Sequence, residues 1–179
     1  DDVSYLKNKI QTNHDIISGI FLTKNLTSEP ANFLTPAEFV NQIEDLKKIG
    51  IEIDILDETR MSDLGMNALL GVGKGSKNKS YLAVMKWNGN PKIESNIAFV
   101  GKGVCFDSGG LSLKTGRGMM DMKEDMGGAG IVVGAMKAIA MQKIKTNVIG
   151  VVGLVENMPD ANAQRPGDVI KSCLLYTSD

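Results

Sequence analysis

The chain of 179 residues has about the length of one domain, and with 42% hydrophobic residues, 23% charged residues and a net charge of −1 it has an ordinary globular composition. This charge offers no basic face for nucleic acid, and no apolar run approaches the ~20 residues of a membrane span. We do not expect the acidic, polar N-terminus DDVSYLKNK to be a secretory signal. The cysteines, Cys105 and Cys173, lie far apart and favour a reducing, cytoplasmic location. We therefore expect no nucleic-acid or membrane partner.

The first third of the chain predicts two helices and a strand. Apolar residues at mostly helical spacing predict an amphipathic helix over 3–26. A capping box, with Thr35 followed by Pro36 and then Glu38, begins a second helix that runs to about Lys48 and stops at Gly50. The strictly alternating stretch IEIDIL predicts a strand over 51–56.

The rest of the chain alternates helices with apolar strands. We expect helices over 57–64 and 122–142, and strands over 68–72, 81–87, 97–100 and 147–155. This alternation predicts an α/β fold with a mixed, largely parallel sheet sandwiched between helices in an α/β/α arrangement. No internal repeat, low-complexity segment or domain linker interrupts the sequence.

Two glycine-rich stretches suggest a site but fit other motifs poorly. GVGKGS (71–76) lacks the spacing of both the phosphate loop and the dinucleotide-binding loop, so we interpret it as a tight solvated turn between two strands. FDSGG (106–110) resembles the nucleophile segment of trypsin-like serine proteases. A serine nucleophile normally needs a nearby base, and the only histidine, His14, lies on the polar part of the first predicted helix. We therefore expect His14 to be a surface residue and reject the serine-protease interpretation.

A metal site is a third possibility. Lys102 and Asp107 follow a buried strand, at the sheet edge where ligand sites of α/β folds gather, and Asp125 lies close to the start of the next helix. Carboxylates without histidines suit hard or borderline divalent cations. A lysine can join them only with a neutral amine, which nearby divalent charge favours. From spacing alone, surface lysines and capping aspartates remain an alternative.

Several long segments, in the right order, resemble the cytosolic leucine aminopeptidase family. The similarity extends from about residue 15 to about residue 171 and is carried by SEPANFLTP (28–36), LGMNALLGVGKGS (64–76), VGKGVCFDSGGLSLK (100–114), MDMKEDMGGAG (120–130) and ENMPDANAQRPGDV (156–169). The resemblance implies a cytoplasmic, leucine-preferring aminopeptidase that acts on peptides with two divalent metal ions, Mn²⁺ or Zn²⁺. It also implies a homo-hexamer for the full-length family, a state that need not hold for this chain.

The resemblance also assigns roles to five residues. Lys102 matches a metal ligand, Asp107 the carboxylate that bridges the two metals, and Asp125 a ligand of the second metal near the substrate's α-amine. Lys114 matches the catalytic electrophile that stabilises the oxyanion. Met122 matches a residue that lines the pocket for the N-terminal side chain. Together Met122, Lys102, Asp107 and Asp125 would contact the substrate.

The sequence departs from the family in three places. Cys105 stands where threonine is usual and Thr115 where proline often follows the lysine. No segment resembles the family's NTDAEGR motif, which supplies an aspartate, a glutamate and the arginine of a bicarbonate site. We therefore expect residues 1–172 to be the N-terminal part of a catalytic domain that is incomplete at its C-terminal side, and residues 173–179 to be a non-native tail. The chain itself would then be inactive, with exposed apolar surface on its sheet. A pseudo-enzyme, or a metal-binding or assembly module, is the alternative.

Overall fold

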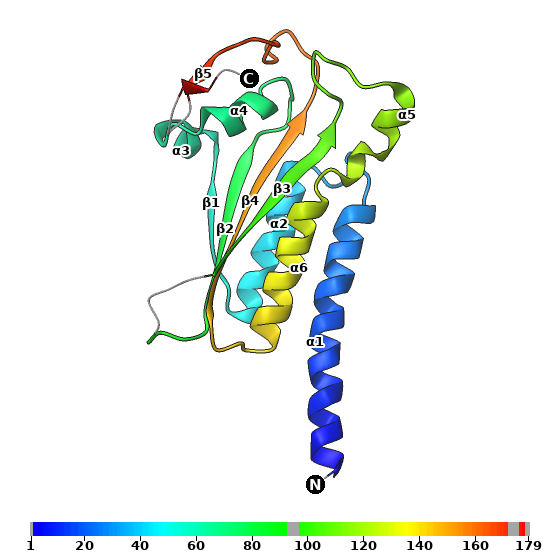
Figure 1. Ribbon diagram of the computed structural model, residues 1–179, viewed down its shortest axis with the longest axis vertical. Helices are drawn as coiled ribbons and strands as arrows, with labels where there is room; N and C mark the ends of the chain where they lie inside the picture. Colours follow the sequence, from blue (N-terminus) through cyan, green and yellow to red (C-terminus); the bar gives the residue numbers. More distant parts are fainter. Residues whose placement is uncertain (1, 93–96, 172–175, 178–179) are drawn as a thin grey trace.

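A mixed four-stranded sheet forms the centre of the computed structural model, which describes residues 2–92, 97–171 and 176–177 (Figure 1). The strand order is β1 (Glu52–Leu56), β2 (Tyr81–Asn88), β4 (Asn147–Asn157) and β3 (Ile97–Asp107). A two-residue pairing joins β5 (Ile170–Lys171) to β6 (Tyr176–Thr177). Apart from 176–177, the predicted tail 173–179 lies outside the described residues. The predicted α/β class and mixed sheet are confirmed.

The sheet is less parallel than predicted. β2 runs antiparallel to both β1 and β4, and only β3 and β4 are parallel. Parallel neighbours need a crossover connection, and the helix α6 (Gly127–Met141) supplies it between β3 and β4. The helices α3 (Glu58–Asp63) and α4 (Asn67–Gly73) link β1 to β2 without returning the chain to the start of β1, so these two strands run in opposite directions.

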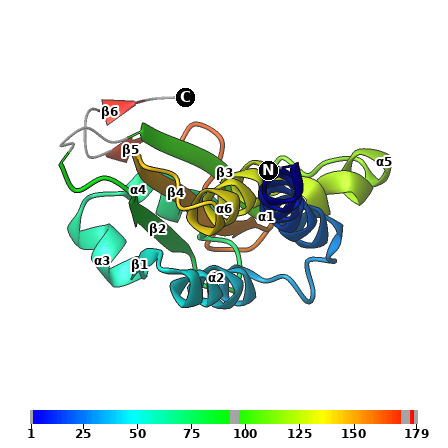
Figure 2. The ribbon, with the colours of Figure 1, turned by 90° about the horizontal axis from the view of Figure 1, so that it is seen from below.

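Helices cover the two faces of the sheet unequally. The helices α2 (Pro36–Glu44) and α6 pack on one face, and α1 (Asp2–Ser28) lies along α6. Figure 2 shows these three helices nearly end on. On the other face, Leu69 of α4 packs against Gly153, whereas Val100 on the edge strand β3 is 79% exposed. No described helix has both the length and the apolar character needed to cross a membrane.

Local sequence explains most of the element boundaries. Thr35 caps α2 by accepting a hydrogen bond from the Glu38 N–H at 3.3 Å, and Gly50, with φ of +89°, ends the 3₁₀ helix Asp45–Ile49 that follows. The predicted helix over 122–142 is divided into the 3₁₀ helix η2 (Met120–Glu124) and α6, and a short helix, α5 (Gly116–Met119), precedes η2. The other predicted helices, over 3–26 and 57–64, are found as α1 and α3. The amphipathic character predicted for the first is wrong, because the buried residues of α1 are Asp15, Gly19 and Leu26, whereas most of its large apolar side chains are exposed.

Two strand predictions need correction. Residues 68–72 form the helix α4, because a short apolar run fits a helix as well as a strand and Ala-Leu-Leu favours the helix. The strand predicted over 97–100 continues to Asp107. A Cβ at Gly101 would lie 2.6 Å from the carbonyl oxygen of Gly128, so glycine lets α6 pack directly on the extended strand.

The core lies between the sheet and the helices α1, α2 and α6. Phe39 and Ile43 of α2, Met136 of α6, and Met85 and Val152 of the sheet are fully buried in one cluster. This packing fixes β3 and β4 side by side, so their carboxyl ends open together at one end of the sheet (Figure 1).

Candidate active site

The candidate site lies where the parallel strands β3 and β4 end. Asp107 is the last residue of β3, Asn157 is the last residue of β4, and the two are paired in register. Ligand sites of open α/β sheets favour this edge, outside the carboxyl ends of the strands. The position predicted for Asp107 is therefore the position that the structure gives it.

The loop after Asp107 is built around the buried serine Ser108. The Ser108 hydroxyl and N–H both donate to the Asn157 carbonyl, at 2.7 and 2.9 Å, and the hydroxyl accepts from the Gly110 N–H at 3.2 Å. Gly109 and Gly110 have φ of +89° and +64°, which favour glycine. With 2% of its surface exposed, Ser108 holds the loop and is not placed as a nucleophile.

The loop returns Lys114 to Asp107. The Lys114 Nζ lies 3.0 Å from Oδ2 of Asp107, and Oδ1 accepts hydrogen bonds from the Gly109 N–H at 2.9 Å and the Asn157 side chain at 2.8 Å. Burial by itself raises the pKa of Asp107, but the hydrogen bonds from Lys114, Gly109 and Asn157 together lower that pKa below its usual value. Asp107 is thus an ionised carboxylate with a cation beside it.

A second ion pair joins Lys102 to Asp125. Lys102 lies within β3 and not after its end as predicted, because the strand continues to Asp107, and Asp125 lies between η2 and α6, close to the start of α6 as predicted. The Lys102 Nζ is 2.7 Å from both carboxylate oxygens and donates a hydrogen bond to Oδ1. Oδ2 is buried, and beyond this ion-pair contact no described residue donates a hydrogen bond to it. Gly128 packs directly against the backbone of Lys102, since a Cβ at Gly128 would lie 3.0 Å from the backbone nitrogen of Lys102.

Four of the five predicted residues are therefore joined in two lysine–carboxylate pairs. The fifth, Met122, is half-buried in η2, and its carbonyl accepts a hydrogen bond from the Asp125 N–H at 3.4 Å. His14 is a surface residue of α1, as expected, with 67% of its side chain exposed. Within residues 2–92 and 97–171, no three His, Cys, Asp or Glu side chains gather closely enough to hold a metal ion. The described acidic groups therefore do not form a cluster of three such ligands by themselves.

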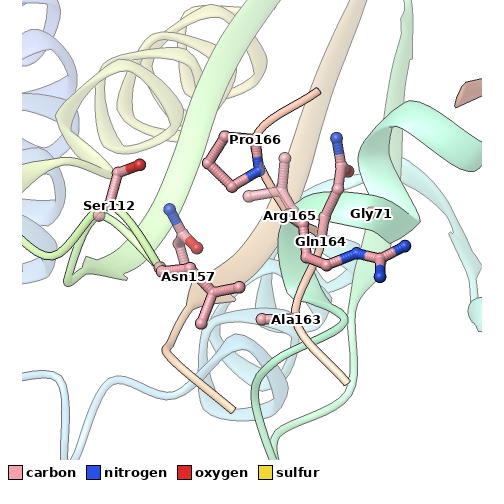
Figure 3. Close-up of a pocket in the computed structure, with 11 residues that line it drawn as sticks. Gly71, Ser112, Asn157, Ala163, Gln164, Arg165 and Pro166 are labelled. Carbon is pink, nitrogen blue, oxygen red and sulfur yellow. The ribbon is translucent and has the colours of Figure 1, made fainter. Parts of the chain in front are cut away.

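The sequence analysis missed a cavity of about 240 Å³ beside this loop. Figure 3 shows Asn157 and Ser112 on one side of it and the segment 163–166 on the other. Gly71 of α4 also lines the cavity. The stretch GVGKGS (71–76) forms the end of α4 and the turn after it, and not a turn between two strands. This turn is not simply solvated, because a Cβ at Gly75 would lie 2.1 Å from the Met158 carbonyl oxygen.

Asn157 is the functional candidate that the sequence analysis overlooked. It is a polar residue at the end of a continuous apolar strand, which is the same signal that singled out Asp107. Its contact with Asp107 depends on the parallel pairing of β3 and β4, and the sequence does not give that register.

Comparison with known proteins relates this chain to a family. Residues 21–176 match the sequence profile of the cytosol aminopeptidase family, catalytic domain. A probable cytosol aminopeptidase of Nitrobacter hamburgensis is 52% identical over 171 residues, which cover 96% of this chain and 34% of that protein. A probable cytosol aminopeptidase of Agrobacterium fabrum is 57% identical over 157 residues, covering 88% of this chain and 32% of that protein.

A solved structure shares the fold. The bottromycin maturation enzyme BotP, in complex with Mn, has a TM-score of 0.86 and 34% identity to this chain, over 92% of this chain and 36% of that one. The chain thus spans about a third of the length of the relatives it matches.

Proposed function

Because the chain belongs to the cytosol aminopeptidase family, we propose that its residues form part of a metal-dependent aminopeptidase site that releases N-terminal amino acids, leucine foremost, from peptides. The observation that carries the proposal is the pair of lysine–carboxylate contacts, Lys102 with Asp125 and Lys114 with Asp107, beside a loop held by Ser108. The names of the relatives support a cytoplasmic location.

The donor atoms of the site suit divalent cations. The buried Asp125 Oδ2 has no hydrogen bond among the described residues and is contacted by the Lys102 ammonium at 2.7 Å, a place that a divalent cation would take when Lys102 is neutral. Asp107, Asp125 and a neutral Lys102 would be the ligands that this chain supplies to two ions, Mn²⁺ or Zn²⁺. The Mn complex of BotP supports the use of a divalent metal. When bound, such ions polarise the scissile carbonyl and activate water.

The chain's own residues would bind and orient the peptide. A protonated Lys114 would donate to the carbonyl oxygen of the scissile bond and stabilise the negative charge that develops on it. Asp125 would lie near the free α-amine and so restrict cleavage to the first residue. Met122 would line the pocket for the side chain of that residue. The family's bicarbonate arginine has no counterpart in the sequence, so we assign no residue to that role.

We propose that the 179-residue chain alone is inactive and binds metal weakly. Only three of the family's ligand positions are present in it, and no three acidic, histidine or cysteine groups gather in its described part. Incubation with leucine amide and Mn²⁺ or Zn²⁺ should release no leucine. Metal-dependent leucine release by the purified chain would contradict this proposal.

A chimaera tests the complete site. The 157 aligned residues of the Agrobacterium fabrum relative would be replaced by those of this chain, which are 57% identical. We expect the folded chimaera to hydrolyse leucine amide with Mn²⁺ and to lose this activity when the metal is removed with a chelator. A folded, Mn²⁺-loaded chimaera without activity, beside an active parent enzyme, would overturn the proposed function.

A further inference from the structure

Asn157 holds the Asp107 carboxylate from the neighbouring strand. The two residues end β4 and β3 in register, and the Asn157 Nδ2 donates to Asp107 Oδ1 at 2.8 Å. The carboxylate can only accept, so the amide nitrogen, and not its oxygen, faces Asp107. An amide and a carboxylate are therefore joined across the strand ends where the proposed site lies.

Asn157 is also held at its backbone, and its side-chain oxygen is closely packed. Its backbone carbonyl accepts both hydrogen bonds from Ser108, and its side-chain oxygen lies against Gly110, where an added Cβ would be 2.8 Å away. Glycine at position 110 thus leaves just enough room for the amide. The side chain has a defined orientation before any ligand binds.

The two oxygens of Asp107 have different partners. Neutral donors, the Asn157 amide and the Gly109 N–H, hold Oδ1, whereas the Lys114 ammonium lies 3.0 Å from Oδ2. Of these three partners, Gly109 belongs to the loop that follows Asp107, and Lys114 is a long, partly exposed side chain. Asn157 is the partner that belongs to a strand of the sheet. It therefore sets the plane of the carboxylate relative to the sheet.

We infer that Asn157 is a positioning residue that orients Asp107 for metal binding. This inference rests on the proposed function, in which Asp107 is a metal ligand. Residues that hydrogen-bond to metal-ligating carboxylates typically change metal affinity by 10–100-fold when they are removed. We expect a loss of that size from Asn157, although it contacts no metal itself.

The first experiment tests the contact without metal. In the ¹H–¹⁵N spectrum of the metal-free 179-residue chain, the Asn157 side-chain NH₂ should give a downfield-shifted resonance. The Asp107→Ala variant should move this resonance upfield. An Asn157 resonance that is unchanged in the variant would overturn the inference, because the amide would not then be bonded to the carboxylate.

The second experiment measures the consequence in the chimaera. Mn²⁺ affinity, measured from the electron paramagnetic resonance of free Mn²⁺, should fall at least tenfold in Asn157→Ala and in Asn157→Val, whose β-branched side chain suits a strand. The matched control is Asn162→Ala, which removes an amide-to-carboxylate hydrogen bond of the same kind, from Asn162 Nδ2 to Asp160 Oδ1 at 3.1 Å, in the exposed loop after β4. We expect Asn162→Ala to change Mn²⁺ affinity less than threefold.

The possible outcomes distinguish a failure of this inference from a failure of the proposed function on which it rests. If the unsubstituted chimaera binds Mn²⁺ and the Asn157 variants bind it equally well, the positioning role is wrong and the proposed function stands. If Asn162→Ala weakens Mn²⁺ binding as much as the Asn157 variants do, the loss does not depend on the Asn157–Asp107 contact and the inference fails. If the unsubstituted chimaera binds no Mn²⁺, the proposed function fails and the inference falls with it.

Discussion

The Lys102 ammonium lies 2.7 Å from both carboxylate oxygens of Asp125 and so links β3 to the turn before α6. The lysine side chain is 61% exposed, whereas that of Asp125 is 19% exposed. Solvent therefore screens much of the attraction, and this ion pair contributes little to stability. Ligand binding is the role that we propose for it instead, since Oδ2 of Asp125 is buried and makes no hydrogen bond with a described residue beyond its ion-pair contact with Lys102.

Asp125→Asn should separate these two contributions. The neutral amide keeps the shape of the side chain, so we expect the free energy of unfolding of the chain to change by less than about 1 kcal/mol. In the chimaera the same variant should lose Mn²⁺, as metal analysis would show. Asp54→Asn removes the acid of the exposed Asp54–Arg60 pair and should leave the metal content unchanged. Full Mn²⁺ loading of Asp125→Asn would contradict its role as a ligand.

Lys114→Ala should reduce catalysis and spare the metal. Loss of one donor to a developing oxyanion typically costs about 10²–10³-fold in kcat, and the chimaera should retain its Mn²⁺. Lys79→Ala, at an exposed loop position, is the control and should change kcat less than twofold. A Lys114→Ala enzyme with normal kcat would remove Lys114 from the mechanism.

The thiol of Cys105 should be unreactive in the folded chain. Burial, with a smaller contribution from the charge of Glu156, raises its pKa to about 12. In a Cys173→Ser background, iodoacetamide at pH 9 should label Cys105 only after unfolding in urea. Labelling of the folded chain at the rate of the unfolded chain would contradict the burial.

The raised pKa of Cys105 also predicts a pH dependence of stability. The unfolded thiol ionises near pH 8.5, so the folded state binds one more proton than the unfolded state between about pH 9 and pH 12. The contribution of Cys105 to stability is therefore complete below pH 8 and is lost as the pH rises through this range. Urea unfolding should show a smaller alkaline loss in Cys105→Ala than in the unsubstituted chain.

Gly101→Ala should destabilise the contact between α6 and the sheet. The added Cβ would lie 2.6 Å from the backbone oxygen of Gly128, which cannot move without shifting the helix, and such overpacking costs about 1–3 kcal/mol. Gly116→Ala is the control, since no atom lies within 4 Å of its Cβ position, and it should change stability by less than about 1 kcal/mol. Equal urea midpoints for the two variants would contradict this packing.

Local signals in the sequence were enough for most of the fold. The capping residues at Thr35 and Gly50, the alternation in β1 and the apolar run of β4 all have local causes, and each prediction is confirmed. The helix α4 was mistaken for a strand because its apolar run is too short to show a period. The direction of β2 depends on where α3 and α4 lie, which is a tertiary property.

The candidate site was only partly accessible to sequence reasoning. Spacing left Lys102 and Asp107 open between ligands and surface residues, and the family resemblance favoured the ligand interpretation, which stays a prediction. The structure adds which groups meet, namely Lys102 with Asp125 and Lys114 with Asp107. Asn157 was missed because its contact with Asp107 arises from strand register, which no local motif specifies.

Metal analysis of Asp107→Ala in the chimaera tests the central claim most directly. If Asp107 bridges two divalent ions, its loss removes a ligand from both, so the purified variant should contain almost no Mn²⁺ while the unsubstituted chimaera holds two ions per chain. Ser112→Ala, at an exposed position in the same loop, should load like the unsubstituted chimaera. A folded Asp107→Ala variant that carries two Mn²⁺ ions would contradict the account.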